Sequence, residues 1–433
     1  MARWTNWSGG VATDLQGVFS PGDELSLRHV FGTEEGPFRI AGSGHSFTPI
    51  CETDGTILSL ERLSGVLDVD TSTQRARVNA GTTIRDLGPL LHDAGLGLIN
   101  QGDIDRQTIA GAVGTGTHGT GNELGSLSST VQGFRMVMPD GEALTCSASG
   151  NADLFDAGRV SMGTLGVMSE IELQCRPKYA LEEKGGRMAL ADLFSSLDEL
   201  IRSNRHFEFF WFPFADEVLV KTLNEVEAEP KPRRRAPDGL VGEGDKAFRR
   251  LCEISRAAPF LRGRFQRRMT SQGGARYSGD EAGRVRWSHD AFPSDRNVRF
   301  NEMEYAVPAA QGAECVQELA DYMRKEGGNF LFPIEYRTVA ADDIWLSPFY
   351  QRDSVTISIH QYHKQSYERL FRGAEAIFRR YDGRPHWGKI HFLKARDFAE
   401  MYPKWDQFTA LRRRVDPRGK LLSPYFQKIF GEG

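Results

Sequence analysis

Glycine-rich turns constrain this chain most strongly, and the first of them is Gly42-Ser43-Gly44-His45-Ser46. It follows a short apolar segment that ends at Ala41. Glycine permits positive φ angles, so the backbone N–H groups of such a turn can approach an anion closely. The stretch therefore predicts a phosphate-binding loop that presents His45 to whatever the phosphate carries. Taken alone, the same residues are equally typical of a glycine turn with one exposed histidine.

The second glycine-rich stretch lies within residues 101–125, which are almost all small, polar or glycine and predict a long functional loop. Its Gly114-Thr115-Gly116-Thr117-His118-Gly119 matches the dinucleotide fingerprint G-x-G-x-x-G, with Asp140 at the expected spacing. A nicotinamide site is nevertheless disfavoured, because 107–110 is a poor strand, 122–130 has no amphipathic face, and Asp140 belongs to an Asp-Gly hairpin turn. A Walker A loop is excluded, because no Gly-Lys-Ser/Thr follows.

Size and composition exclude several classes of protein. The 433 residues exceed one ordinary domain, so two domains are expected. The net charge of −4 argues against a nucleic-acid-binding chain. Five scattered cysteines are typical of reduced thiols, not of a disulfide framework or a zinc site. No secretory h-region or membrane-length apolar run is present, so we expect a cytoplasmic protein.

The first 177 residues predict mixed helices and strands. Alternation of apolar and polar residues over 66–70 and 75–79 predicts a hairpin. Thr83, with Asp86 three residues later, predicts the start of a helix that ends at Gly95. Further strands are expected at 38–41, 56–60, 131–138 and 143–146, with another ending near Pro177 after the glycines at 163–166.

Beyond residue 177 the pattern favours an α+β layer. Helices are expected at 190–201, 311–326 and 366–380, and strands at 207–214, 330–339 and 354–361, which predicts an antiparallel sheet with helices on one face. On such a strand Glu335 and Arg337 share a face. They form either an exposed ion pair or a polar clamp that stabilises negative charge on a hydroxylated substrate. No metal site is predicted, because the four late histidines, His360, His363, His386 and His391, lack the spacing of known ligands.

Residues 228–268 contain 12 basic and 5 acidic residues, including three arginines at 233–235. Phe248, Leu251 and Ser255 are spaced as one face of a helix within this segment. A basic amphipathic helix of this kind can bind weakly to a membrane or an acidic partner. A solvated helix on a surface insertion is the more ordinary interpretation.

Several motifs occur together in one order: Thr5-Asn6-Trp7, Gly42 to Phe47, Ile109 to Gly119, Glu335-Tyr336-Arg337 and His386-Trp387-Gly388-Lys389. In this combination nearly the whole chain resembles the FAD-linked oxidases of the vanillyl-alcohol-oxidase type, and most closely the sugar-lactone and alditol oxidases. The resemblance implies an α+β fold with a two-subdomain FAD-binding domain over 1–177. It also implies a substrate or cap domain built on an antiparallel sheet over 178–393, and a C-terminal segment, 394–433, that returns to the FAD domain.

The resemblance further implies a role for each candidate residue. His45 would be joined covalently to the 8α-methyl group of FAD, and the glycine loops would contact the rest of the cofactor. The cofactor-binding residues are predicted to be Ala41, Gly42, Ser43, Gly44, His45, Ser46, Gly111, Gly114, Thr115, Gly116, Thr117, His118, Gly119, Gly163, Gly166 and Val167. Arg337, helped by Glu335, would polarise the substrate oxygen. Lys389 would stabilise the reduced anionic flavin, and Thr108 would lie near the substrate hydroxyl.

The implied reaction is hydride transfer to flavin N5 from a carbinol of an aldono-1,4-lactone, such as L-gulono- or D-arabinono-lactone. Oxygen or an electron-carrier protein would be the acceptor, and the bulky Gln107 beside Thr108 leaves oxidase and dehydrogenase both open. Oxidation of the terminal hydroxyl of a polyol, such as xylitol or sorbitol, is the close alternative. A non-catalytic binding protein and a nicotinamide dehydrogenase are more distant alternatives, and both predict a protein without flavin colour.

Overall fold

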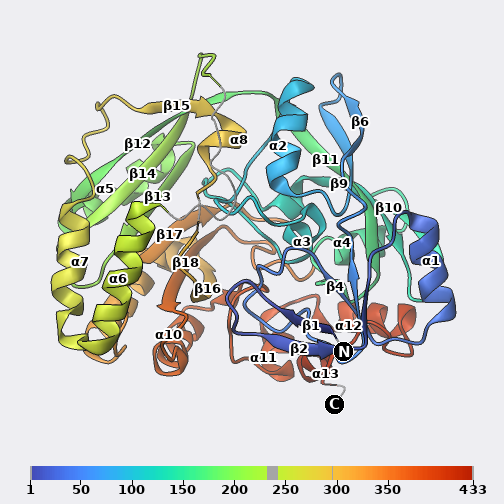
Figure 1. The fold of residues 1–433 in the computed structure, drawn as a ribbon. Coiled ribbons are helices and arrows are strands. Elements are labelled where there is room, and N and C mark those ends of the chain that lie inside the picture. Colours follow the sequence, from blue (N-terminus) through green and yellow to red (C-terminus); the bar gives the residue numbers. More distant parts are fainter. Residues whose placement is uncertain (1, 232–241, 295, 432–433) are drawn as a thin grey trace.

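The structure, a computed structural model, describes residues 2–231, 242–294 and 296–431. Figure 1 shows two sheet-based halves side by side, a mixed half up to Pro177 and a half built on one large sheet from Ala180 onward. Within the described ranges, no helix is both long and apolar enough to cross a membrane.

The first half begins with two small sheets that position the glycine–histidine loop. One is the hairpin of β1 (Ala2–Thr5) and β2 (Ala12–Leu15), and the other is parallel, in the order β3 (Gly17–Phe19), β5 (Thr56–Ser59), β4 (Phe38–Ala41). Helix α1 (Glu24–Thr33) begins after Asp23, whose carboxylate accepts a hydrogen bond from the Ser26 backbone N–H at 2.7 Å. Because β4 ends at Ala41, the loop from Gly42 to Ser46 leaves directly from the carboxyl end of a parallel strand.

A six-stranded antiparallel sheet completes this half. Its members are β6 (Val66–Asp70), β7 (Arg75–Asn79), β8 (Leu96–Leu98), β9 (Val131–Val137), β10 (Ala143–Ser147) and β11 (Val167–Pro177). Both predicted hairpins, β6–β7 and β9–β10, are confirmed. Helix α2 (Ile84–Asp93) is confirmed too, because the Thr83 hydroxyl accepts from the Asp86 backbone N–H at 3.1 Å.

The prediction that residues 101–125 are loop throughout was wrong, because α3 (Ile109–Gly114) lies inside them. The Thr108 hydroxyl caps α3 by accepting from the Gly111 backbone N–H, and Ile109, Ala112 and Val113 are buried beneath it. Capping and burial together outweigh the low helix propensity of the glycines. The first half also contains the turn η1 (Leu127–Thr130) and helix α4 (Ala152–Gly158).

The second half contains an eight-stranded sheet in the order β15-β12-β14-β13-β17-β18-β16-β19, and every pair in it is antiparallel, as predicted. Three of its strands had been expected, now bounded as β13 (His206–Trp211), β17 (Ile334–Val339) and β18 (Ser354–Tyr362). Five had not: β12 (Ala180–Ala189), β14 (Glu217–Val226), β15 (Arg284–Trp287), β16 (Phe300–Pro308) and β19 (Arg384–Pro385).

Helices α5 (Leu190–Ser203), α9 (Gly312–Lys325) and α10 (Glu368–Arg380) pack against this sheet. Tyr336 of β17 stacks on Phe209 at 4.6 Å and lies against Gly312 at the start of α9. Because side chains alternate along a strand, the neighbouring Glu335 and Arg337 point to the opposite face. That face is turned toward the first half of the molecule.

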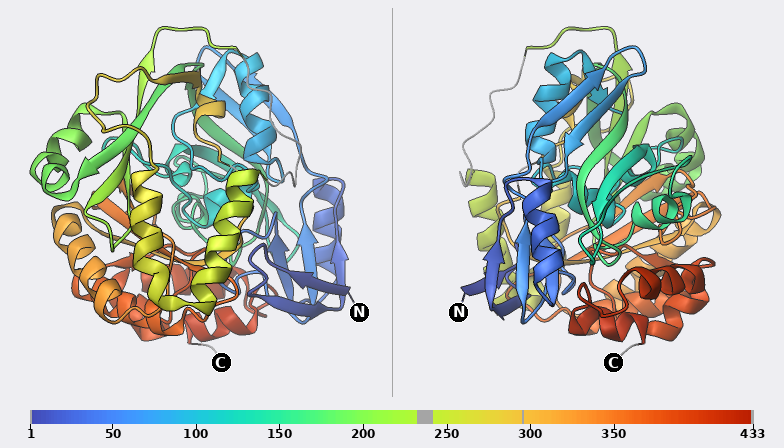
Figure 2. Two further views of the ribbon diagram at one scale, coloured as in Figure 1. Left: turned by 60° about the vertical axis from the view of Figure 1, so that its left-hand side comes forward. Right: turned by 90° about the vertical axis from the view of Figure 1, so that its right-hand side faces the viewer.

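The remaining helices are α6 (Glu243–Ala257), α7 (Arg262–Ser271), α8 (Ser288–Ala291), α11 (Ala395–Met401), α12 (Trp405–Val415) and α13 (Pro424–Phe430), with short turns at η2 (Pro259–Leu261) and η3 (Ala309–Gln311). In both views of Figure 2 the C-terminal helices form the lowest layer. The segment between α12 and α13 contacts the first half, because the Phe38 backbone N–H donates to the Lys420 carbonyl at 2.7 Å.

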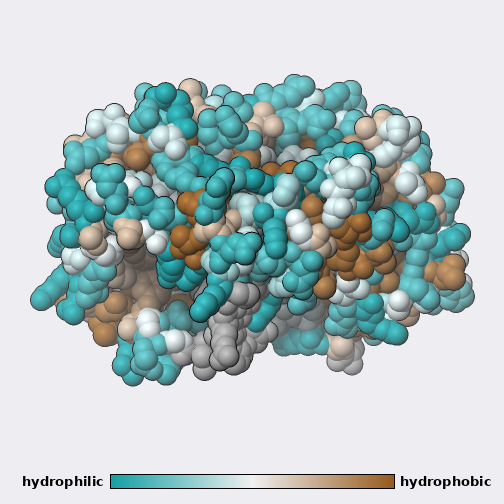
Figure 3. Space-filling view, turned by 90° about the horizontal axis from the view of Figure 1, so that it is seen from above, coloured by the Kyte–Doolittle hydropathy of each residue, from teal (hydrophilic) through white to brown (hydrophobic). Residues whose placement is uncertain are grey.

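Apolar side chains of both halves join in one large buried cluster. The face in Figure 3 is largely hydrophilic, and its apolar residues form separate patches. The core therefore holds the two halves together, and the polar groups of the site lie within this shared interior.

Candidate functional site

Two adjoining cavities contain most of the predicted site residues. The first encloses about 960 Å³ between protein atoms and the second about 700 Å³, both partly open to solvent. The cavities share four lining residues: His45, Ser46, Gln107 and Thr115. A ligand in the first cavity would therefore meet a ligand in the second beside His45.

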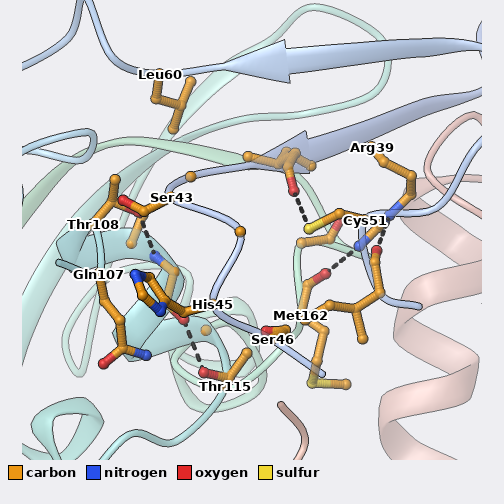
Figure 4. A pocket seen from close by; sticks show the side chains of 18 of the residues that line it. Arg39, Ser43, His45, Ser46, Cys51, Leu60, Gln107, Thr108, Thr115 and Met162 are labelled. Carbon is orange, nitrogen blue, oxygen red and sulfur yellow. Dashed lines mark hydrogen bonds between the residues drawn. The ribbon is translucent and has the colours of Figure 1, made fainter. Parts of the chain in front are cut away.

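The loop that carries His45 requires glycine at two positions. Gly44 has φ +69°, which L side chains rarely adopt. A Cβ atom on Gly42 would lie 2.4 Å from the Thr108 hydroxyl oxygen, so a side chain there would displace the N-terminus of α3. Figure 4 shows Ser43 and Thr108 beside His45 in this cavity. The loop backbone and α3 thus form one tightly packed wall.

Arg39, which sequence reasoning missed, holds this wall in place. Its guanidinium is buried and donates to four backbone carbonyls, those of Ile50 at 2.7 Å, Gly163 at 3.1 Å, Met162 at 2.5 Å and Leu421 at 2.6 Å. Burial lowers the pKa of Arg39 to about 10, and the group remains cationic at neutral pH. One side chain thus joins β4, the 162–163 turn and the C-terminal segment.

His45 lies at the junction of the cavities with its ring stacked on Trp7 at a centroid distance of 5.8 Å. Burial, with the cations Lys389 and Arg106 nearby, lowers the pKa of His45 to about 4. The imidazole is therefore neutral near pH 7. A neutral imidazole has the lone pair that a nucleophile needs.

The segment from His386 to Lys389 docks on the His45 loop. The Phe47 backbone N–H donates to the Gly388 carbonyl at 2.7 Å, and the Thr48 hydroxyl donates to the Trp387 carbonyl at 2.8 Å. Lys389 extends into the second cavity, where its Nζ lies 2.5 Å from Glu302 Oε2. Burial alone would lower the pKa of Lys389, but the Glu302 carboxylate raises it above its ordinary value. Lys389 is therefore a fixed cation.

Arg337 lies at the centre of a buried charge cluster. Its Nε donates to Glu208 at 2.7 Å, its Nη2 donates to Asp103 at 3.1 Å, and it also pairs with Glu335. Within the described residues Nη1 has no such partner, and Arg337 lines the second cavity. Although burial alone would lower it, the pKa of Arg337 is well above its ordinary value, because Glu335, Asp103 and Glu208 surround the guanidinium. One N–H face of a permanent cation remains for a substrate oxygen.

Glu335 lies behind Arg337 and does not line either cavity. Burial raises its pKa above the ordinary value, and the negative charges of Asp103 and Glu208 add to this effect against the attraction of Arg337. The Ser358 hydroxyl donates to Glu335 at 3.3 Å. Glu335 can therefore support Arg337, but it reaches the cavity only through that guanidinium.

Two carboxylates of β16, Glu302 and Glu304, line the second cavity and were not predicted. Glu304 Oε1 lies 2.8 Å from His118 Nε2, and the His118 ring lies 5.8 Å from that of His386. Burial alone would raise the pKa of Glu304, but His118 holds it well below its ordinary range. The alternation of Met303, Tyr305 and Val307 with these glutamates was the available signal, although it suggests a solvent-facing polar side.

The first cavity is lined by most of the predicted cofactor residues: Gly42, Ser43, Gly44, His45, Ser46, Gly111, Gly114, Thr115, Gly163, Gly166 and Val167. The second is lined by Thr117, His118, Arg337 and Lys389 of the predicted set, in addition to the shared His45, Ser46 and Thr115. Ala41, Gly116, Gly119 and Glu335 line neither cavity, and Thr108 lines only the first. Thr108 is therefore not brought together with Arg337 and Lys389. The second cavity also contains unpredicted polar residues, namely Asp103, Arg296, Glu302, Glu304 and His386.

The four late histidines do not gather as one ligand set in the described part of the chain. The groups that bring three ligand-type atoms together are His118, Glu304 and His386, and Glu302, Glu335 and His360. Members of both groups form hydrogen bonds or ion pairs with other side chains of the site.

Known proteins are similar to this chain over nearly its whole length. The family model described as D-arabinono-1,4-lactone oxidase matches residues 171–429, and the model described as FAD binding domain matches residues 17–147. The chain is 40% identical to L-gulono-1,4-lactone dehydrogenase of Mycobacterium tuberculosis, with 99% of each chain covered. It is 31% identical to L-gulonolactone oxidase of Bos taurus, covering 99% of this chain and 98% of the other.

Among solved structures, a solvent-stable cholesterol oxidase superposes with a TM-score of 0.82 over 99% of this chain and 97% of the other. Its sequence identity is 18%. At that identity the likeness shows the fold, and it confirms the predicted α+β arrangement.

Proposed function

The chain belongs to the D-arabinono-1,4-lactone oxidase family of FAD-dependent oxidoreductases, and we propose that it oxidises a carbinol of an aldono-1,4-lactone, such as L-gulono- or D-arabinono-1,4-lactone. Oxygen or an electron-carrier protein takes up the electrons. Support comes from the relatives named above and from the pairing of a glycine-lined cavity with a charged one.

The first cavity suits FAD because its walls are mostly backbone. Gly42 and Gly44 allow a close approach, and Gly163 and Gly166 approach from the opposite segment. The loops at 42–46 and 111–115 would hold the phosphates, and Gly163 to Val167 would lie along the cofactor. FAD, when bound, supplies the acceptor for a hydride from the carbinol carbon. The neutral His45 would carry the covalent link.

The observation that carries the proposed function is the placement of Arg337 and Lys389 in the cavity that meets the first one at His45. Arg337 would hold the substrate oxygen through Nη1 and stabilise negative charge that develops on it. Lys389 would supply a second fixed cation on the cofactor side. Glu335 would position Arg337. The proximity of Thr108 to the substrate hydroxyl remains a prediction.

The charge balance of the second cavity favours a neutral, polyhydroxylated ligand. Three carboxylates line it, those of Asp103, Glu302 and Glu304, opposite the cations of Arg296, Arg337 and Lys389. A lactone or polyol finds both donors and acceptors there without bringing a net charge. This composition serves lactones and open polyols alike, so polyol oxidation stays the second candidate.

The same proposal gives each part of the chain a role. Residues 1–177 and 394–433 would bind FAD, and residues 178–393 would form the substrate side. A cytoplasmic location is proposed as well, and the five cysteines support it, because all are free and buried.

Anaerobic substrate reduction tests this function. FAD-loaded protein is mixed with L-gulono-1,4-lactone, D-arabinono-1,4-lactone, xylitol or sorbitol, and the loss of flavin absorbance is followed. We expect the lactones to bleach the flavin fastest. Faster bleaching by xylitol or sorbitol would instead assign the enzyme to polyols, and no bleaching by any of the four would contradict the proposal. Reoxidation by oxygen, compared with an artificial acceptor, then separates oxidase from dehydrogenase.

A further inference from the structure

The feature that the proposed function leaves unused is the pair of helices α6 and α7 with the turn between them, residues 243–271, called here the basic helix pair. It contains eight basic and three acidic residues, in a chain that has four more acidic than basic residues overall. Figures 1 and 2 show the two helices joined by a short turn at their lower end. Positive charge is therefore concentrated on one part of an otherwise acidic molecule.

The inner side of the basic helix pair is fixed to the body of the protein. The Ser255 hydroxyl donates to Asn329 Oδ1 at 3.1 Å, and Gln266 Oε1 accepts from the Phe214 backbone N–H at 3.1 Å. Phe248 packs edge-on against Phe332 at 4.9 Å. These contacts define which side of the pair faces outward.

The outer side presents guanidinium groups without internal partners. Arg249, Arg250, Arg264 and Arg268 are exposed, and no carboxylate in the described part of the chain pairs with them. Arg256, by contrast, pairs with Glu253 at 3.1 Å. Like charges on one surface repel each other, so binding of an external anion relieves this repulsion.

The turn adds apolar surface to this charge. Phe260, within η2, is 81% exposed, and Ile254, in the last turn of α6, is 47% exposed. A large exposed aromatic side chain among arginines is the composition of interfacial membrane-binding segments, in which the ring enters the headgroup region and the cations bind lipid phosphates.

We propose that the basic helix pair docks on an anionic lipid bilayer. Phe260 and Ile254 enter the interfacial region, while Arg249, Arg250, Arg264 and Arg268 bind lipid phosphates. A bilayer accepts a projecting aromatic ring at any point, whereas an acidic protein would need a pocket shaped to receive it. The enzyme would thereby work as a peripheral protein at a membrane surface, which goes beyond the oxidation of its substrate.

Vesicle co-sedimentation of the FAD-loaded protein tests this inference. Vesicles of phosphatidylcholine alone are compared with vesicles containing about one-third phosphatidylglycerol. We expect binding to the anionic vesicles only, weakened by added salt. Arg264→Glu combined with Arg268→Glu should weaken binding by about 30-fold or more, and Phe260→Ser by about tenfold.

The matched control is Arg396→Glu combined with Lys428→Glu. These exposed residues lie on α11 and α13, and the change alters net charge by the same amount. The control should bind like the unchanged protein, and the flavin absorption of every variant reports that it is folded. Absence of binding to anionic vesicles, or an equal loss in the control, would overturn the inference. Retention on immobilised polyglutamate without vesicle binding would assign the surface to an acidic protein partner instead.

Discussion

Side chains that line the two cavities differ in how firmly the protein holds them. Arg337 pairs with three carboxylates, and Arg39 donates to four carbonyls. The His45 ring, in contrast, is held mainly by stacking on Trp7 and by burial. Such a ring keeps its nitrogen atoms for a ligand, which is what a covalent attachment site requires.

His45→Ala should break the proposed covalent link. After acid precipitation, flavin colour should move from the pellet of the unchanged protein to the supernatant of the variant. His29→Ala, an exposed histidine on α1, is the control and should keep the colour in the pellet. Flavin that stays in the pellet of His45→Ala would rule out this link.

Arg337→Lys should lower kcat by about 100-fold or more, because an ammonium group keeps the charge but cannot hold three carboxylates and still present an N–H to the substrate. Steady-state kinetics at matched flavin content measure this. Arg284→Lys changes an exposed arginine that pairs with Glu183 at 2.6 Å, and it should leave kcat unchanged. A change in kcat below threefold for Arg337→Lys would argue against contact with the substrate.

Helix α3 places Thr108 beside the first cavity, apart from Arg337 and Lys389 in the second. Its hydroxyl caps the helix and lies against Gly42. Thr108→Ala should lower the free energy of unfolding by about 1 kcal/mol and weaken FAD retention, with little change in KM for the lactone. Thr108→Ser keeps the capping oxygen, so this variant should retain the stability and the FAD binding of the unchanged protein. Urea unfolding and substrate titrations distinguish the outcomes, since a large rise in KM with unchanged stability would favour the predicted contact with the substrate.

Elements with local signals were predictable from the sequence. The β6–β7 hairpin follows from alternation, and α2 follows from its Thr83 cap. Helix α3 was missed because its glycines read as a loop, and only tertiary burial of Ile109 and Val113 reveals it. Strand β16 has the alternation of a half-buried strand, but this pattern does not reveal that its glutamate face is buried in the second cavity.

The sequence predicts the site residues that lie in short motifs. It does not predict those that are brought together only by the folded structure. The His45 loop and Lys389 stand out in the sequence, yet nothing in the sequence places Asp103 and Glu208 on Arg337, since those residues are more than a hundred positions away. Buried charges need partners, but physical chemistry does not say which distant carboxylates supply them.

The buried histidines make the molecule sensitive to acid. Burial lowers the pKa of His206, His386 and His391 to about 4, from 6.5. The unfolded chain therefore binds more protons between pH 6.5 and pH 4, so stability should fall as the pH is lowered through that window. Each of these histidines lowers the free energy of unfolding by up to about 3 kcal/mol across this window. Asp342 offsets part of that loss, because burial raises its pKa to about 6.

Urea unfolding at a series of pH values measures how steeply the free energy of unfolding falls as the pH is lowered. His206→Gln removes one titrating group while an amide can still donate to the Thr120 carbonyl, which the ring nitrogen now contacts at 2.7 Å. The variant should show a shallower loss of stability between pH 6.5 and pH 4. If the free energy of unfolding falls equally steeply with pH in both proteins, groups other than His206 dominate the loss of stability in acid.

The hydrogen bonds from Phe38 and Arg39 to Lys420 and Leu421 have a consequence for the order of events during synthesis. The wall of the first cavity starts near residue 38, but one of its carbonyl partners, Leu421, is translated 382 residues after Arg39. Until Leu421 has left the ribosome, the Arg39 guanidinium lacks one of its four acceptors. The wall of the first cavity is therefore complete only once this segment has been translated, and a nascent chain stalled before residue 416 should retain FAD less firmly than the full chain.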